Sequence, residues 1–419
     1  MNINKQAQET DITTLVLLSV IMLTPALLLT TNNFSVASVV LLVIYSIYNL
    51  VQKPWVRLNN FDKLVVACMC AYFIGAIPVA MVDGSTARYF QGGVRLLFCV
   101  PIYLFLRTYK KPHLDKYIQS LTIGVIIGCF GSLIIAIYQY FILGMERVDG
   151  FLFSINFGYL ACALTFLAIC LTQFGWLRIW LNAAAFASVI ATLLTFTRGA
   201  IFAIPLLFIL IAVLNFRKLS GLKIIVVTSC LFFGASISYL TSHNMQERID
   251  FTIQELTAIA HGNVDQSISS GGRLQLWKAA SYAFASAPLT GLPYEQREAL
   301  NRELHAKGIV SDWVLSVGRG HAHSQYFEMI ASNGIWGLSS IVAIYLIPLV
   351  IFGRHYLKTD STTAFTATVF VAGFMIYGLT EAPLQANLIG TFYGFILALF
   401  FSIVRVEKYS SASKEEKVQ

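Results

Sequence analysis

Residues 118–142 read IQSLTIGVIIGCFGSLIIAIYQYFI, a run that contains no Asp, Glu, Lys or Arg. A helix needs about 20 apolar residues to cross the ~30 Å hydrocarbon core of a bilayer. This stretch therefore predicts a transmembrane helix, and similar stretches recur along the chain. The predicted spans are approximately 12–31, 34–51, 62–82, 88–106, 118–142, 151–173, 179–197, 200–216, 223–240, 333–353, 364–382 and 386–404, about twelve in all.

The composition also indicates a polytopic membrane protein. Of the 419 residues, 57% are hydrophobic and only 12% are charged, whereas a soluble globular domain carries about 25% charged residues. This balance excludes a soluble enzyme, a secreted disulfide scaffold and a disordered chain. All seven cysteines lie in apolar runs, where we expect them to act as small packing residues. The N-terminus lacks the charged n-region and cleavage site of a signal peptide, so we expect the first helix to stay in the mature protein.

The formal charge of +8 is distributed unevenly along the chain. With the N-terminus inside, eighteen of the 29 Lys and Arg residues flank the inner ends of the spans, as the positive-inside rule requires. The basic balance is therefore an orientation signal and does not indicate a nucleic-acid partner. It predicts cytoplasmic termini and an outward-facing insert. The expected parts are nine spans in 1–240, a helical periplasmic loop at 241–328, three spans in 329–405 and a cytoplasmic tail at 406–419.

A few outer arginines are not explained by the positive-inside rule. Arg88 and Arg95 are two helical turns apart and are expected on one helix face. Arg95 would lie about 18 Å from the cytoplasmic end of its span, inside the hydrocarbon, where an arginine faces a polar cavity or snorkels to the surface. Arg198 closes the seventh span in Thr-Phe-Thr-Arg-Gly-Ala and could be a simple interfacial anchor. Together, the three suggest an outer cationic site, and the planar guanidinium suits phosphate.

The long insert is predicted to contain helices. In residues 244–261 apolar side chains recur at helical spacing, which indicates an amphipathic helix that Gly262 ends. After a flexible stretch, Gly-Gly-Arg-Leu-Gln-Leu-Trp at 271–277 opens a second helix that Pro288 closes. Arg273 falls in the first turn of this helix, where the helix dipole disfavours a cation. A bound anion would make a cation at that place easier to understand.

The segment Arg-Gly-His-Ala-His-Ser-Gln-Tyr-Phe-Glu at 319–328 stands just before the tenth span. Its two histidines could ligate a metal, but no Cys, H-x-x-x-H or H-E-x-x-H pattern accompanies them. Flanking Gly, Ser and Gln at the mouth of a span make a catalytic base a credible alternative to a structural histidine. Glu381 lies in the last outer turn and could pair an arginine, bind substrate or be solvated. The chain has no D-x-D, P-loop or G-x-S-x-G motif.

Three motifs in this order carry a resemblance to a known family. They are Thr-Arg-Gly around Arg198, Gly-Arg-x-x-x-Trp around Arg273 and His-x-His-Ser around His323, with Asn-Phe-Gly at 156–158 as a weaker signature. The chain resembles the O-antigen ligase/polymerase superfamily in these motifs and, over most of its length, in topology. Ser324 follows His323 where relatives often show Asn, and the next residue is Gln rather than Asp or Glu, so no acidic role carries over to that place.

The resemblance implies a GT-C-like glycosyltransferase of the bacterial inner membrane with a periplasmic active site. Ligases of this superfamily join undecaprenyl-diphosphate-linked O-antigen to lipid A–core oligosaccharide. Polymerases extend the same lipid-linked glycan, and longer protein O-oligosaccharyltransferases transfer it to protein. Twelve spans with one insert of modest size look most like a ligase. A transporter of lipid-linked glycan is the alternative from another class, and it would show an internal repeat with broken helices, which we do not find in the sequence.

The expected chemistry needs no metal or other cofactor. A diphosphate is a good leaving group, and arginines can neutralise its developing charge. One displacement by an acceptor hydroxyl would invert the anomeric carbon, with His323 as the base. Both substrates are anchored in membrane lipid, so we expect a cavity that opens sideways to the bilayer. The residues expected at the diphosphate are Arg88, Arg95, Arg198 and Arg273, and the expected supporting residues are His321, Arg319 and Gln325.

Overall fold

The computed structural model describes residues 2–52, 57–84, 87–109, 111–216, 240, 243–261 and 270–415. Every regular element in these residues is a helix, so the predicted all-α class is confirmed. The main helices are α1 (Asn2–Ala26), α2 (Phe34–Gln52), α3 (Asn60–Gly75), α4 (Ile77–Asp83), α5 (Gln91–Phe98), α6 (Val100–Leu106), α7 (Lys111–Ile137), α8 (Ser154–Leu171), α9 (Arg178–Leu194), α10 (Arg198–Leu214), α12 (His243–Ala260), α13 (Ser270–Ser286), α14 (Tyr294–Ala306), α15 (Trp313–Ser316), α16 (Gln325–Ile341), α17 (Ile347–Thr359), α18 (Thr362–Tyr377) and α19 (Asn387–Glu415). Short 3-10 or π turns include η1 (Ala87–Phe90), η2 (Tyr138–Ile142), η5 (Gly318–Gly320), η6 (Val342–Leu346) and η7 (Pro383–Gln385).

Among the described residues, seven helical segments are long and apolar enough to cross a membrane, and four shorter apolar helices accompany them. The long segments are Phe34–Gln52, Asn60–Asp83, Ala87–Leu106, Asp115–Ile142, Ser154–Phe174, Gln325–Thr359 and Asn387–Tyr409, and the shorter ones are Thr13–Ala26, Arg178–Leu194, Arg198–Leu214 and Thr362–Tyr377. Each corresponds to a predicted span. The remaining predicted span, 223–240, lies outside the described residues except for its last residue.

The tenth span begins earlier than its hydropathy predicts. The helix starts at Gln325, eight positions before the predicted start, because its polar first turns are buried against other parts of the protein. Gln325 is fully buried, and Glu328 and Ser332 are 2% and 4% exposed. A polar side chain that is hydrogen-bonded inside the protein does not break a helix, although it lowers the hydropathy of the sequence there.

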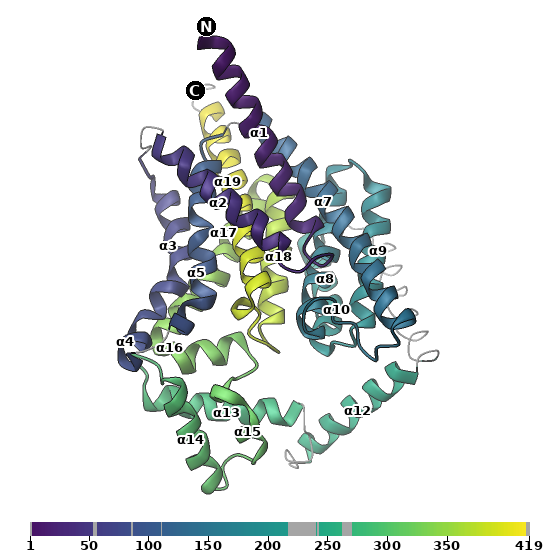
Figure 1. Ribbon diagram of the computed structural model, residues 1–419, viewed down its shortest axis with the longest axis vertical. Helices are drawn as coiled ribbons and strands as arrows, with labels where there is room; N and C mark the ends of the chain where they lie inside the picture. Colours follow the sequence, from purple (N-terminus) through teal and green to yellow (C-terminus); the bar gives the residue numbers. More distant parts are fainter. Residues whose placement is uncertain are drawn as a thin grey trace.

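The helices form a bundle around α19, and the insert lies apart from the chain termini. The apolar part of α19 is 94% buried, while α1 packs on α7 and α8 on α9. In Figure 1 both chain ends lie at the top of the view, whereas α12, α13, α14 and α15 lie together at the bottom. The insert is therefore at the opposite end of the bundle from the termini, which is the relative arrangement that the charge distribution predicts.

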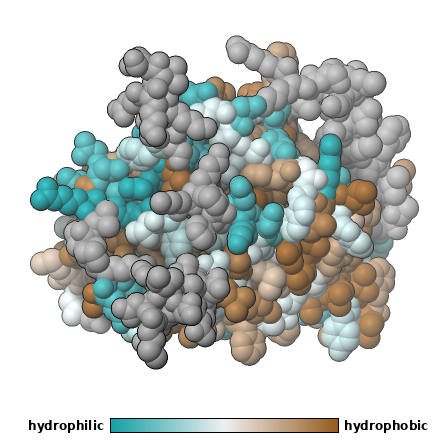
Figure 2. Space-filling view, turned by 90° about the horizontal axis from the view of Figure 1, so that it is seen from above, coloured by the Kyte–Doolittle hydropathy of each residue, from teal (hydrophilic) through white to brown (hydrophobic). Residues whose placement is uncertain are grey.

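The outer faces of the bundle carry large apolar side chains, as expected for contact with lipid. Leu41, Ile134 and Ile179 are 65%, 66% and 83% exposed. In Figure 2 brown hydrophobic residues gather along the right and lower rim, and teal hydrophilic residues lie at the left and centre. Soluble monomers rarely expose contiguous apolar surface on this scale.

A buried ion cluster joins three spans near the end that carries the termini. Asp62 on α3 is fully buried and accepts a hydrogen bond from Tyr103 at 2.7 Å. Arg405 Nε lies 2.6 Å from Asp62 Oδ1, and Arg107 pairs with Oδ2 of the same carboxylate. The sequence predicts these two arginines only as topology signals. They also neutralise a buried charge, and removing one partner of such a pair typically costs about 3–5 kcal/mol.

Candidate active site

The segment from η5 to α16, which carries both histidines, has three residues in an unusual backbone conformation. The φ angle is 62° at Arg319, 61° at Gly320 and 44° at His323, all in the left-handed region. A non-glycine residue in this region costs about 1–3 kcal/mol and persists only where the surroundings hold it. The strain therefore points to a loop that neighbouring groups keep in one shape.

Gln325 is one of the groups that hold this loop. Its backbone nitrogen donates to the carbonyl oxygens of Gly378 and Glu381, each at 2.8 Å. Its side-chain Oε1 accepts from the nitrogen of Leu384 at 3.0 Å. Gln325 thus fastens the start of α16 to the loop between α18 and α19, a contact between segments more than fifty residues apart.

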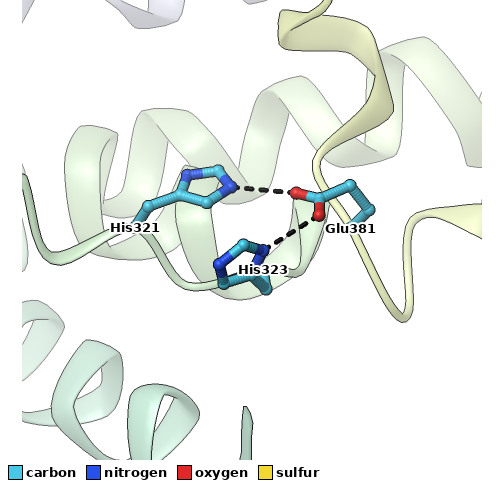
Figure 3. A group of neighbouring side chains, drawn as sticks. All are labelled: His321, His323 and Glu381. Carbon is cyan, nitrogen blue, oxygen red and sulfur yellow. Dashed lines mark hydrogen bonds and ion pairs between the residues drawn. The ribbon is translucent and has the colours of Figure 1, made fainter. Parts of the chain in front are cut away.

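Glu381 on that second loop binds both histidines. Its Oε1 lies 2.9 Å from His321 Nε2, and its Oε2 lies 2.9 Å from His323 Nδ1. The two imidazole rings stand edge to face with centroids 4.8 Å apart. Figure 3 shows both rings reaching from one loop toward the single carboxylate on the other. Of the alternatives open for Glu381 from sequence, the structure shows neither arginine pairing nor a solvated turn, because its side chain is 14% exposed and bonded to histidine.

A second buried carboxylate supports the loop from inside. Glu328 Oε1 lies 2.9 Å from Arg297 Nη1, and Glu328 Oε2 accepts a hydrogen bond from the backbone nitrogen of Ala322 at 2.8 Å. Arg297 also donates to the carbonyl of Gly320, so it holds the loop directly at Gly320 and, through Glu328, at Ala322. His321 Nδ1 lies 3.4 Å from Glu328 Oε2, which places His321 between Glu328 and Glu381.

These surroundings give the two histidines different roles. Burial lowers the pKa of His321, but Glu328 and Glu381 outweigh burial and raise it to about 10. Burial acts to raise the pKa of Glu381, yet its hydrogen bonds to His321 and His323 lower it below the ordinary value. His321 is therefore a cation at neutral pH and cannot accept a proton. With Nδ1 of His323 directed at Glu381, Nε2 of His323 is the ring atom that can.

The charge on His321 should make the stability of the protein depend on pH. A histidine whose pKa is raised from 6.5 to about 10 on folding stabilises the fold fully below 6.5, and this contribution is lost as pH rises through about 10. We expect the difference in melting temperature between wild type and His321→Gln to be constant near pH 6 and to shrink toward pH 10. The exposed His243 supplies a control variant, His243→Gln. A wild-type advantage that does not change between pH 6 and 10 would contradict the assignment.

Arg198 begins α10 and pairs with the insert. Its Nη1 lies 2.7 Å from Glu255 Oε2 and 3.2 Å from the hydroxyl of Thr252, both on α12. Glu255 is 2% exposed and also accepts the backbone nitrogen and the hydroxyl of Ser270, at 3.1 and 2.9 Å. The insert helix α12 and the start of α13 therefore meet the bundle at Arg198.

Two glycines of the sequence motifs allow close approach around Arg198. A Cβ on Gly199 would lie 2.3 Å from the hydroxyl oxygen of Thr380, the residue before Glu381. A Cβ on Gly158, in the Asn-Phe-Gly motif, would lie 2.9 Å from the hydroxyl oxygen of Thr195. Both positions therefore need glycine, and the first brings the Arg198 turn against the loop that carries Glu381.

Arg273 lies one helical turn from a residue that contacts the histidine loop. Trp277 Nε1 donates to the carbonyl of Ala322 at 3.1 Å, between the two histidines, and its ring stacks on Phe327 at 5.1 Å. Positions four apart share a helix face, so Arg273 and Trp277 face the same side of α13. Arg273 Nε is buried and has no hydrogen-bond partner among the described residues. A buried guanidinium nitrogen without an acceptor suits an anionic ligand.

The other expected arginines lie in a second group. Arg95 Nε donates to Asn387 Oδ1 at 2.7 Å, and its Nη1 donates to the carbonyl of Gln385 at 3.3 Å. Arg88 and Arg319 line one polar pocket together. The Arg198 turn thus lies against the loop that carries Glu381, and Arg88 and Arg319 face one pocket.

A shallow groove lies beside Arg95. It has a volume of about 370 Å³ and is lined by side chains that include Phe151, Phe153, Asn156 and Asn387. Phe151 and Phe153 are 51% and 80% exposed. The groove is therefore apolar at its edge and joins the polar group around Arg95 through Asn387.

Sequence reasoning missed two carboxylates and one arginine that support this site. Glu255, Glu328 and Arg297 all bind expected site residues or the loop that carries them. The only available signal was that Glu328 sits in a predicted span entrance, where a carboxylate needs a partner. Which cation supplies that partner depends on long-range contacts that the sequence pattern does not contain.

The group that could hold a metal ion is His321, His323 and Glu381, whose ligand atoms lie within 4.8 Å of one another. Their arrangement favours hydrogen bonds instead. Each histidine nitrogen lies 2.9 Å from a different oxygen of Glu381, which is a hydrogen-bond distance.

A comparison with protein families found one matching segment. Residues 183–342 match the family model described as O-Antigen ligase. The matched segment runs from α9 to the start of η6, so it includes Arg198, Arg273 and both histidines, while Glu381 lies beyond it. No curated protein matches the chain. Residues 183–342 of the chain are therefore similar to the O-antigen ligase family.

Proposed function

We propose that the protein is a metal-independent, inverting glycosyltransferase. It would join O-antigen from undecaprenyl diphosphate to lipid A–core oligosaccharide at the periplasmic face of the bacterial inner membrane. The match of residues 183–342 to the O-antigen ligase family model supports ligase- or polymerase-type activity. The observation that carries the proposal further is the contact between His323 Nδ1 and Glu381 Oε2, because it leaves His323 Nε2 as a base on a strained, fixed loop.

His323 would act on the acceptor. The acceptor hydroxyl gives its proton to His323 Nε2 while its oxygen forms a bond to the anomeric carbon of the donor. Glu381 orients the ring and stabilises the imidazolium that results, since a carboxylate next to a histidine favours its charged form. The cationic His321 shares Glu381 and holds it in place. General base catalysis of this kind contributes about 10²–10⁴-fold to the rate.

Arg198 and Arg273 would act on the leaving group. As the new bond forms, the bond between the anomeric carbon and the diphosphate oxygen breaks, and the electron pair stays on the diphosphate. Arginine is suited to this charge because its planar fork donates two parallel hydrogen bonds. In the structure Arg198 is engaged by Glu255, so a bound diphosphate would share or replace that carboxylate as its partner.

The single displacement would invert the anomeric carbon. A retaining mechanism needs a carboxylate nucleophile within about 5–5.5 Å of a second catalytic carboxyl group. Glu381 is the carboxylate that contacts the proposed base, and each of its oxygens lies 2.9 Å from a histidine nitrogen. This engagement leaves it poorly placed as a nucleophile and well placed as an orienting group.

One product analysis separates the proposed function from its alternatives. Purified protein would be incubated with radiolabelled lipid-linked O-antigen, with and without lipid A–core and with a chelator present in a parallel sample. A ligase yields labelled lipopolysaccharide, and chelation leaves the yield unchanged. Longer lipid-linked chains would indicate a polymerase, and the absence of any covalent product would favour a transporter of lipid-linked glycan.

A further inference from the structure

A polar pocket lies beside the histidine site and is used by no step described above. It is lined by residues from six separate segments, among them Arg88, Arg319, Tyr89, Tyr294 and Asn333. The hollow measures about 390 Å³ when the open space at its mouth is included, but a water-sized group has only about 20 Å³ in which to move inside it. It therefore suits a compact polar group that enters from a larger molecule outside.

The pocket carries net positive charge. Arg88 and Arg319 are both exposed at its edge. Its carboxylate, Glu328, is already bound by Arg297 and His321. No ion pair joins Arg88 or Arg319 to an acidic side chain in the described part of the chain. A site with two uncommitted guanidinium groups selects for an anion.

A buried donor in the pocket lacks an acceptor. Asn333 is 4% exposed, and its Nδ2 has no hydrogen-bond partner among the described residues. Buried amide groups are nearly always hydrogen-bonded in native structures, so this one suggests an acceptor that comes from a ligand. An oxygen atom of a phosphate or carboxylate would supply it.

The rim of the pocket is aromatic and preorganised. Tyr89 and Tyr294 stack with ring centroids 4.4 Å apart, and the nitrogen of Tyr294 donates to the hydroxyl of Tyr89 at 3.0 Å. The guanidinium of Arg319 lies 5.9 Å from the centre of the Tyr294 ring. Tyrosine at the edge of a polar pocket offers both an apolar face and a hydroxyl, which fits a sugar that bears an anionic group.

Glu328 connects this pocket to the proposed base. It lines the pocket and also accepts from Ala322, the residue between the two histidines. We propose that the pocket binds a phosphate or carboxylate group on a sugar of the acceptor, separately from the arginines at the donor diphosphate. This inference rests on the proposed function, because it assigns Arg88, Arg319 and Asn333 to recognition of the acceptor.

Steady-state kinetics with matched acceptors tests the inference. The double variant Arg88→Gln/Arg319→Gln would be compared with wild type on phosphorylated and on dephosphorylated lipid A–core, in nanodiscs of phosphatidylcholine. We expect KM for the phosphorylated acceptor to rise at least tenfold, with kcat, donor KM and KM for the dephosphorylated acceptor unchanged. The variant Arg302→Gln, exposed on α14 and outside the pocket, should match wild type.

Three outcomes would overturn the inference. They are an equal loss on both acceptors, a rise in donor KM, or an effect that appears only when phosphatidylglycerol is added, which would assign the pocket to a lipid headgroup. Equilibrium binding of the soluble phosphorylated core oligosaccharide provides a readout that does not require transfer. If wild type binds this oligosaccharide and the double variant does not, the result supports the proposed ligand of the pocket even when no glycan transfer is detected. If wild type binds the soluble phosphorylated core oligosaccharide but transfers no glycan to lipid A–core, the result would count against the proposed function alone.

Discussion

Replacing His323 by alanine is expected to lower kcat for glycan transfer by about 10²–10⁴-fold, the usual contribution of a general base. KM for both substrates should change little, because proton transfer to His323 belongs to the transition state rather than to substrate binding. The measurement is single-turnover transfer of labelled lipid-linked glycan by purified protein. Added imidazole should restore part of the rate in His323→Ala, an effect that a purely structural role would not produce.

Two further variants sharpen this test. His243→Ala removes a histidine whose side chain is 80% exposed and should leave the rate unchanged. Glu381→Gln keeps the size of the side chain but removes the charge that orients both histidines, and it should lower kcat by a smaller factor, about 10–100-fold. Full transfer by His323→Ala would show that the base is assigned to the wrong residue.

Removing the guanidinium of Arg198 or Arg273 is expected to cause the second large loss. Arg273→Gln and Arg198→Gln should each lower kcat by about 10²–10³-fold, the effect of removing one donor that stabilises transition-state charge. Lysine at either place retains the charge but loses the planar fork, so Arg273→Lys should recover only part of the rate. The exposed Arg302→Gln is the matched control.

Because Arg198 pairs with Glu255, substitutions of these two residues should change the affinity for undecaprenyl diphosphate in opposite directions. Glu255→Gln removes the carboxylate that lies 2.7 Å from Arg198, so undecaprenyl diphosphate should bind several-fold more tightly as a product inhibitor. Arg198→Gln should weaken the same inhibition. If neither substitution changes inhibition by undecaprenyl diphosphate, Arg198 does not contact the leaving group.

Much of the fold could be predicted from single segments. The run at 118–142, with no charged residue, becomes the continuous α7 and η2, which end at Ile142. Its length and hydropathy are local properties, so no knowledge of the rest of the chain was needed. The start of α16 could not be predicted in the same way. Its first turns look too polar for a membrane span, and only the distant Arg297 makes Glu328 acceptable there.

The candidate site was predictable where residues lie close in sequence and less so where they meet across the fold. His321 and His323 stand together in the sequence, and both prove to bind one carboxylate. The identity of that carboxylate, Glu381, depends on how the loop after α18 is fastened to Gln325. Arg88 and Arg95 do share the span Ala87–Leu106, but the sequence does not predict that Arg88 lies in a 3-10 turn, η1, and lines a pocket with Arg319.

The most direct test of the central claim is product analysis in proteoliposomes that contain purified protein, labelled undecaprenyl-diphosphate-linked O-antigen and lipid A–core. The arrangement of His323, Glu381 and the two arginines predicts labelled lipopolysaccharide with an inverted glycosidic linkage. It also predicts that this product disappears in His323→Ala and persists with a chelator. Longer lipid-linked chains without lipopolysaccharide, or no covalent product at all, would contradict the assignment as a ligase.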